Sequence, residues 1–394
     1  MSGPLTSYAS GFAAVLAGQG YRPNSVAAQL QLMAHLSRWM AGEGVEVDGL
    51  TPAVSEAFLV ARRAAGYTLW LSPKALAPLL AHLRGAGVAP RPPAPALSSL
   101  EVLLARFDAY LITERGVGRP TADGYVQMVR PFLAERAVGN EVDLEGLTAA
   151  DVTGFVLTAC PGRSPGSAKL LVTALRSVLG FLHVEGLIPL SLADTVPSVA
   201  GRRLAGLPRS LDPGEVRRLL ATCDRRTRTG RRNFAMMLLL VRLGLRAGEV
   251  RSLGLDDIDW RAGELVICGK GNRVERLPMP ADVGEAVAGY LRRGRPATAE
   301  GRTVFVRVRA PHQALSSTAV TNVVWAAGQR AGLGQLGAHR LRHTAATQMV
   351  RAGVPLPEVG QVLRHRLLLT TAIYAKVDRE GLRLLARPWP GAPA

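Results

Sequence analysis

The chain has 394 residues, 48% of them hydrophobic, so it is long enough for two or three domains with separate cores. Its formal net charge is +18, which favours a polyanionic partner such as nucleic acid. The longest apolar run, Phe234 to Val241, has eight residues, far short of the ~20 of a membrane helix.

Cysteine content and charge clustering refine this picture. The three cysteines have no metal-site spacing, and the N-terminus lacks the basic region of a signal peptide. We therefore expect a cytoplasmic, nucleoid-associated protein without metal or membrane anchor. A GC-rich coding bias would also raise the arginine content, but five arginines fall among the eight residues 225–232. That clustering favours nucleic acid.

Residues 1 to 200 show a helical pattern that occurs twice. Three landmarks recur at a spacing of 97 residues: Arg22-Pro23 with Arg119-Pro120, Gly49-Leu50-Thr51 with Gly146-Leu147-Thr148, and Phe58 with Phe155. The repeat predicts two copies of one helical unit, residues 1–93 and 94–202, joined by a stiff proline-rich linker around residues 89–97. The alternative is two unrelated bundles that share ordinary turn residues.

Residues 203–394 are predicted to form a third domain of helices and one small sheet. Asp212 is the expected N-cap of its first helix, with Glu215 completing a capping box. The apolar run 234–241 predicts a buried helix. Alternation near Ile258 and in 264–268 and 274–277 predicts a three-stranded antiparallel sheet with Lys270 in its second turn. Further elements are expected at 282–293 and 317–332 as helices, and at 303–308 as an extended segment.

The segment Ala338–Lys376 is rich in side chains that bind phosphate. His339 and Arg342 are three residues apart, so they share one face of a helix. The core face of that helix is expected to contain Leu341, Ala345 and Met349. A second helix at 358–363 leads to His365, and Thr371 or the preceding threonine would cap a short helix that presents Tyr374.

Five sequence fragments occur here in an informative order. L-G-L-R-A-G-E contains Arg246, G-K-G contains Lys270, H-x-L-R-H begins at His339, L-x-H-R contains His365, and T-T-x-I-Y ends at Tyr374. Together, over about 130 residues, they resemble the tyrosine recombinases, also called the phage integrase family.

The resemblance implies a multidomain, mainly α fold: helical-bundle DNA-binding units, then an α+β catalytic domain with a small antiparallel sheet. Residues 94–202 would be the core-binding, SAM-like domain and residues 203–394 the catalytic domain with its tail. The implied activity is site-specific recombination of double-stranded DNA, without metal or cofactor, through a 3′-phosphotyrosyl intermediate. The protein would be a tetramer on its DNA sites and a monomer or dimer when free. A tail helix at 378–386 would dock on a neighbouring copy.

The resemblance implies six catalytic residues, and each suits phosphoryl transfer on chemical grounds: Arg246, Lys270, His339, Arg342, His365 and Tyr374. Arginine forks match two phosphate oxygens and meet their charge, and His365 would add a donor. Tyr374 is the nucleophile, and His339 would relay its proton. Lys270 would protonate the leaving 5′-hydroxyl. Glu249 would orient Arg246 or His339.

Each residue also has an ordinary structural interpretation, such as a core tyrosine or a lysine at a hairpin tip. A zinc site formed by His339, His343 and His365 is disfavoured because no carboxylate stands at i+4 spacing, and His343 is assigned a structural place. Two other functions stay open: a type IB topoisomerase, and an architectural DNA-binding protein. The intact catalytic set argues against an architectural protein. The two helical units and the tail after Tyr374 argue against a topoisomerase.

Further arginines are expected to contact DNA: Arg119, Arg130, Arg202, Arg203, Arg225, Arg226, Arg228 and Arg364. Of these, Arg364 occupies a position at which the tyrosine recombinases, the family that the sequence resembles, commonly have glycine. An arginine is costly there if the backbone needs a positive φ. Alternatively, its side chain adds a phosphate contact.

Overall fold

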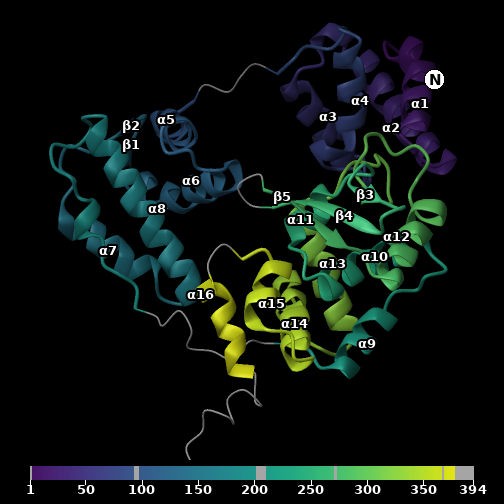
Figure 1. Ribbon diagram of the computed structural model, residues 1–394. Coiled ribbons are helices and arrows are strands. Elements are labelled where there is room, and N and C mark those ends of the chain that lie inside the picture. Colours follow the sequence, from purple (N-terminus) through teal and green to yellow (C-terminus); the bar gives the residue numbers. More distant parts are fainter. Residues whose placement is uncertain (1, 93–96, 201–209, 270–272, 366–367, 378–394) are drawn as a thin grey trace, which may run out of the picture. The chain divides into compact units, whose positions relative to one another are not determined.

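The computed structural model describes residues 2–92, 97–200, 210–269, 273–365 and 368–377 (Figure 1). These residues are mainly helical, with two small antiparallel sheets, which confirms the predicted fold class. Contacts between Cα atoms divide the chain into two compact units, residues 93–205 and residues 1–92 together with 206–394. Lys270, Arg202, Arg203 and the predicted tail helix lie outside the described residues.

The N-terminal segment contains four helices around a core of its own. The helices are α1 (Ala9–Gly18), α2 (Pro23–Gly42), α3 (Pro52–Ala64) and α4 (Pro73–Gly85), with 3-10 turns η1 (Thr6–Tyr8) and η2 (Val47–Gly49). Its core includes Phe12, Leu36, Met40 and Leu59, each fully buried.

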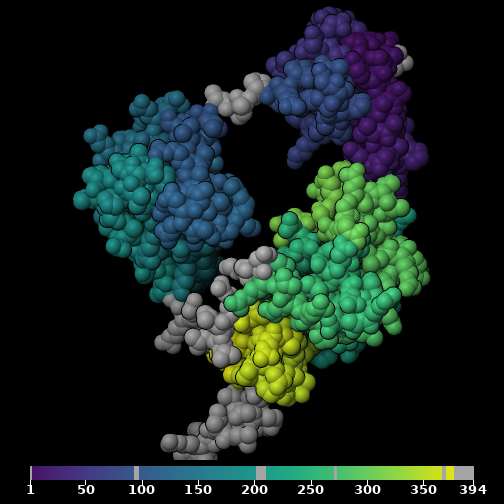
Figure 2. All heavy atoms as spheres, turned by 45° about the horizontal axis from the view of Figure 1, so that its top comes forward, coloured from purple at the N-terminus to yellow at the C-terminus, as the bar shows by residue number. Residues whose placement is uncertain are grey.

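The unit at residues 93–205 repeats this order of helices. It contains α5 (Ser99–Thr113), α6 (Arg119–Ala134), the hairpin β1 (Ala137–Val138) and β2 (Glu141–Val142), α7 (Ala149–Ala159), α8 (Pro165–Val184) and η3 (Ala193–Thr195). In the space-filling view the atoms of residues 97–200 form one closely packed body (Figure 2). Helix α8 is long and apolar enough to cross a membrane, but nine of its residues are buried, eight of them in the hydrophobic core of this unit.

Matched positions of the two helical units play matched structural parts. Thr51 caps α3 and Thr148 caps α7, each with its side chain accepting from the third helical N–H. Phe58 packs against Trp39 of the preceding long helix, and Phe155 packs against Phe132 in the same way. These features support the duplication, which stays a prediction.

The C-terminal segment follows the expected element order. Its helices are α9 (Pro213–Ala221), α10 (Arg228–Arg242), α11 (Ala247–Ser252), α12 (Ala281–Arg293), α13 (Ser317–Arg330), α14 (Ala338–Arg351), α15 (Leu356–Val362) and α16 (Leu368–Thr371), followed by the 3-10 helix η4 (Ala372–Val377). The strands β3 (Ile258–Asp259), β4 (Glu264–Cys268) and β5 (Val274–Pro278) form the predicted antiparallel sheet in the order β3-β4-β5. The Asp212–Glu215 capping box and the buried run of α10 are confirmed.

The extended segment predicted at 303–308 is not a regular strand. Among the described residues it makes only isolated bridges, between Gly254 and Thr303 and between Val306 and Ala314. Its main-chain groups bond to several partners in turn: Val304 donates to Leu253, and Val306 donates to the Tyr290 hydroxyl. Because no single partner strand runs beside it, no ladder forms.

Candidate active site

Arg246 is placed by a sharp turn after α10. Gly244 has a φ of +58°, and a Cβ there would lie 2.6 Å from Leu363 Cδ2. Only glycine fits both the conformation and the close approach. The turn takes the chain from the buried helix α10 into α11, with Arg246 at the α11 N-terminus.

Glu249 fixes Arg246 at two points. The carboxylate oxygen Oε2 accepts from the Arg246 main-chain N–H at 2.8 Å, and Oε1 accepts from Arg246 Nη1 at 2.6 Å. Glu249 is 5% exposed, whereas 38% of the Arg246 side chain is exposed. Burial would raise the pKa of Glu249, but the Arg246 hydrogen bonds and the charge of Arg364 outweigh it and lower that pKa. The carboxylate thus orients Arg246 rather than His339.

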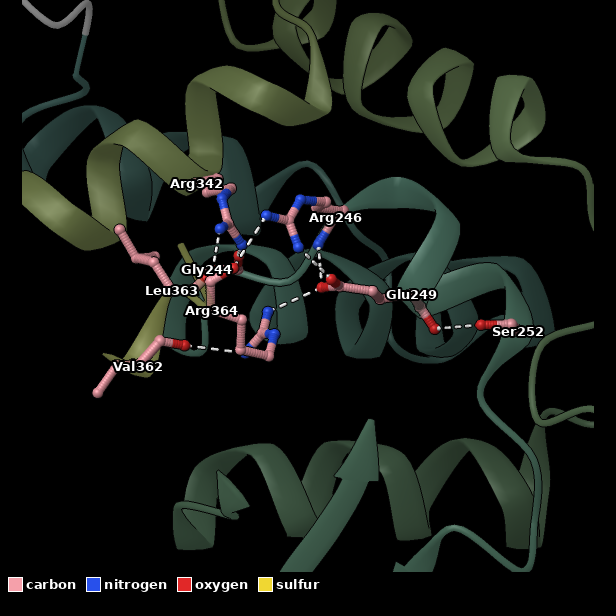
Figure 3. Close-up of polar contacts among 8 residues, drawn as sticks. All are labelled: Gly244, Arg246, Glu249, Ser252, Arg342, Val362, Leu363 and Arg364. Atoms are coloured by element: carbon pink, nitrogen blue, oxygen red, sulfur yellow. Dashed lines mark hydrogen bonds and ion pairs between the residues drawn. The ribbon is translucent and has the colours of Figure 1, made fainter. Parts of the chain in front are cut away.

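Arg342 comes from the buried face of α14 and is 2% exposed. Its two terminal nitrogens donate to the carbonyl oxygens of Gly244 and Leu363 (Figure 3). Burial and the charges of Arg246 and Arg364 lower the pKa of Arg342 to about 10, so the guanidinium is still charged at neutral pH. The turn that carries Arg246 therefore also holds Arg342.

Arg364 takes a place that the sequence analysis did not assign. Its φ is +56°, the conformation in which an arginine is costly. The side chain is 3% exposed and donates to Glu249 Oε2 at 2.7 Å. Its guanidinium therefore lies on a carboxylate inside the protein rather than on a DNA-facing surface.

Tyr374 lies on η4 and is 2% exposed. Its hydroxyl and His343 Nδ1 are 2.8 Å apart. Burial raises the pKa of Tyr374 to about 12. Burial and the neighbouring His339 and Arg342 lower the pKa of His343 to about 4. A neutral His343 can therefore accept the phenolic hydrogen bond at pH 7.

This contact differs from the sequence analysis, which gave the proton relay to His339 and a structural place to His343. His339 is more exposed than His343. The two imidazole rings meet edge-on, with their centroids 4.5 Å apart. Burial, Arg342 and Arg246 lower the pKa of His339. The two histidines are four apart on α14, so they share a face. That spacing was the signal that either could reach Tyr374.

His365 stands beside Tyr374 with its ring parallel to the phenol, the centroids 6.4 Å apart. Its Nδ1 and Thr371 Oγ1 are 2.8 Å apart. Burial and the charges of Arg342, Arg246 and Arg364 lower the pKa of His365 to about 4. Thr371, one of the two threonines expected to cap the short helix, instead fixes the His365 ring.

Comparison with known proteins decides the family. Residues 209–380 match the model of the phage integrase family. An integrase/recombinase of Sinorhizobium fredii, y4rA, is 39% identical over 99% of this chain and 95% of its own length. The chain belongs to the phage integrase family. The tyrosine recombinase XerD of Mycobacterium tuberculosis is 32% identical over 75% of this chain and 98% of its own length.

Solved structures share the fold of this phage integrase family member. XerH recombinase bound to a palindromic difH substrate is 19% identical, with a TM-score of 0.57 over 74% of this chain and 97% of that one. A lambda integrase dimer bound to a COC′ core site is 18% identical, with a TM-score of 0.55 over 86% and 89%. Membership of the tyrosine recombinases makes the protein an enzyme that cleaves and rejoins DNA strands, and neither the topoisomerase nor the architectural alternative is favoured.

The arginines expected to contact DNA are in different situations in this chain. Arg225, Arg226 and Arg228 are exposed, although Arg226 pairs with Asp224 and Arg225 lies over the Phe234 ring. Arg119 and Arg130 are ion-paired, to Asp108 and Asp123 and to Glu101 respectively.

Two arginines of the cluster at 225–232 donate hydrogen bonds to main-chain carbonyls of the protein itself. Arg232 is buried, with Nη1 donating to the Val306 carbonyl at 3.1 Å. Arg231 donates to the Arg293 carbonyl at 3.1 Å. Burial of Arg232 therefore makes the surface charge of this segment smaller than its sequence indicates, whereas the Arg231 hydrogen bond lies at the surface.

Proposed function

We propose that this protein is a site-specific DNA recombinase whose Tyr374 attacks the scissile phosphate and forms a 3′-phosphotyrosyl bond. One observation carries this assignment: Arg246, Arg342, His365 and Tyr374, spread over 129 positions of the chain, meet around one turn. Side chains that only contribute surface charge would not need to lie together in this way. The relatives named as integrases and recombinases support it.

The reaction is an exchange of phosphate esters. Tyr374 Oη bonds to phosphorus as the bond from phosphorus to the 5′-oxygen breaks. The phenolic proton passes to His343, whose Nδ1 already faces the hydroxyl. The leaving 5′-oxygen takes a proton from Lys270. A 5′-hydroxyl of a second strand then attacks the phosphotyrosine, which rejoins DNA and frees Tyr374.

The guanidiniums of Arg246 and Arg342 would meet the charge on the nonbridging phosphate oxygens. Electrostatic stabilisation by fixed donors of this kind is commonly worth 10²-fold or more in rate. His365, held by Thr371, is neutral at pH 7 and would donate a further hydrogen bond. The two guanidiniums would supply the positive field, so the proposed reaction uses neither a metal ion nor a nucleotide cofactor.

The helical units and oligomer would serve DNA recognition. We assign residues 94–202 as the core-binding domain, residues 1–93 as a second copy that adds DNA or neighbour contacts, and residues 203–394 as the catalytic domain. The solved structures of relatives bound to their recombination sites support a double-stranded DNA partner. We propose assembly of a tetramer on DNA, with the tail of one copy docked on the next.

Trapping of a covalent adduct tests the proposed function. The full-length protein is incubated with its flanking genomic DNA carrying a nick that lets the short 5′-hydroxyl fragment diffuse away. The expected result is an SDS-resistant protein–DNA adduct whose tryptic peptide carries a nucleotide on Tyr374. Absence of any adduct on sites that the protein binds tightly would leave a DNA-binding protein without strand cleavage.

A further inference from the structure

Arg364 stands just beyond α15 in a conformation that usually belongs to glycine. The helix ends at Val362, and Arg364 follows its C-cap with a φ of +56°. The turn is closed by main-chain hydrogen bonds, from Arg364 N to Gln361 at 2.8 Å and from His365 N to Gly360 at 2.9 Å. A left-handed residue with a side chain persists only where surrounding contacts hold it.

The side chain of Arg364 is held inside the protein. Nη2 donates to Glu249 Oε2 at 2.7 Å, and Nη1 donates to the Val362 carbonyl at 2.9 Å. Nε is buried and has no hydrogen-bond partner among the residues that the structure describes. A buried guanidinium with incomplete hydrogen bonding is unfavourable by itself. The protein nevertheless keeps the Arg364 side chain in this position, so the role of its ion pair with Glu249 has to be explained.

Glu249 links Arg364 to Arg246. Both guanidiniums point toward the one carboxylate, Arg246 on Oε1 and Arg364 on Oε2 (Figure 3). The Arg364 carbonyl also accepts a long hydrogen bond, 3.4 Å, from Arg246 Nη2. Arg364 therefore acts on Arg246 twice, through the shared carboxylate and through its own main chain.

Charge balance gives this arrangement a consequence for phosphate binding. Glu249 paired with Arg246 alone would largely cancel the positive field that Arg246 presents to an incoming anion. A second guanidinium on the same carboxylate restores that field, and the low exposure of the pair limits screening by water.

We propose that Arg364 is a positioning residue for strand cleavage, which holds Glu249 from its second side so that Arg246 keeps both its orientation and its positive field. This inference rests on the proposed function, because it concerns the same reaction. Arg364 itself is buried, so its loss should change the rate of cleavage rather than the affinity for DNA.

The test compares Arg364→Gly with a matched control, Arg302→Gly. The first variant suits the left-handed backbone and removes the guanidinium. The second removes an arginine from an ion pair with Asp256 in which both side chains are 68% exposed. In single-turnover cleavage of the nicked substrate, we expect Arg364→Gly to be about ten- to a hundredfold slower, approaching the loss of a direct donor. Arg302→Gly should cleave at the wild-type rate, and Kd for DNA should change less than about twofold in both.

A second substrate separates positioning from a merely structural role. Replacing one nonbridging oxygen of the scissile phosphate by a methyl group removes the charge that Arg246 meets. Arg364→Gly should then lose much less rate on this methylphosphonate than on the phosphate, and Arg364→Lys, which keeps the charge, should recover most of the phosphate rate. Cleavage of the phosphate by Arg364→Gly at the wild-type rate would overturn the inference. So would an equal loss of cleavage rate on the phosphate and on the methylphosphonate. Failure of the proposed function would appear separately, as no adduct with the wild type.

Discussion

Replacing Tyr374 by phenylalanine should separate the covalent chemistry from folding and binding. The ring is 2% exposed and packs in a cluster with Ala346, Val350, Val359 and Leu363, and phenylalanine keeps all of this contact area. The loss is one hydrogen bond of 2.8 Å to His343. Such a bond contributes about 1 kcal/mol, and His343 is only half-buried, so water can replace part of it. The melting temperature should fall by about 2–4 °C.

Two measurements on Tyr374→Phe check this reasoning. Calorimetry should give the small change in melting temperature, and titration with duplex site DNA should give an unchanged Kd. On the nicked substrate, the wild type should form the adduct and the variant should form none. An adduct that persists in Tyr374→Phe would move the nucleophile to another residue. A loss of several kcal/mol of stability would instead make the hydroxyl a structural anchor.

Four further measurements test separate parts of the site. Arg342→Ala should slow cleavage ~10²-fold or more and also lower the melting temperature, because it releases the Gly244 and Leu363 carbonyls; an unchanged rate would contradict its role. Lys270→Ala should be slow on ordinary DNA but near wild type with a 5′-thiolate leaving group, which needs no proton; no recovery would remove the general-acid role. The pKa values of His343 and His365 are lowered to about 4 in the folded protein, from an ordinary value of 6.5. Between these two pH values the unfolded chain therefore binds more protons than the folded protein does. The free energy of unfolding should therefore be level above pH 7 and fall between pH 6.5 and 4, by up to about 1.4 kcal/mol per pH unit for each histidine; a flat urea midpoint over this range would refute those shifts. Finally, log K for DNA should fall with log salt with a slope of about −0.9 per neutralised phosphate, and a slope near zero would contradict electrostatic DNA binding.

The elements that the sequence predicted correctly are those fixed by short-range patterns. Asp212 and Glu215 form a capping box because both partners lie within one turn. The run from Ala235 to Val241 is buried because every face of this two-turn stretch of α10 is apolar. The three-stranded sheet follows from alternation and turn residues in neighbouring segments. In each case the information is contained in a stretch of at most about 20 consecutive residues.

The contacts that the sequence did not predict depend on residues far apart in the chain. Arg364 and Glu249 are 115 residues apart, so the motif could show the unfavourable conformation but not the partner that holds the side chain. His339 and His343 share a helix face, and the packing of η4 against α14 decides which of them meets Tyr374. Arg232 is buried because its helix turns that position toward the Val306 carbonyl, which a local count of charges cannot register.

The arginines and the tyrosine of this site stand in different relations to an incoming phosphate. Arg342 already has its guanidinium fixed by two carbonyls, and a phosphate oxygen is a stronger acceptor than a carbonyl. Arg246 keeps 38% of its side chain exposed while Glu249 orients it. Arg246 therefore needs little reorganisation to meet a phosphate, which is the condition under which fixed charges stabilise a transition state best. Arg342 is 2% exposed and would have to exchange a carbonyl for a phosphate oxygen. Tyr374, 2% exposed and bonded to His343, must move before its oxygen reaches phosphorus. In the proposed reaction, phosphate binding by Arg246 and delivery of the nucleophile would thus be separate steps, the first of which leaves the contact between Tyr374 and His343 in place.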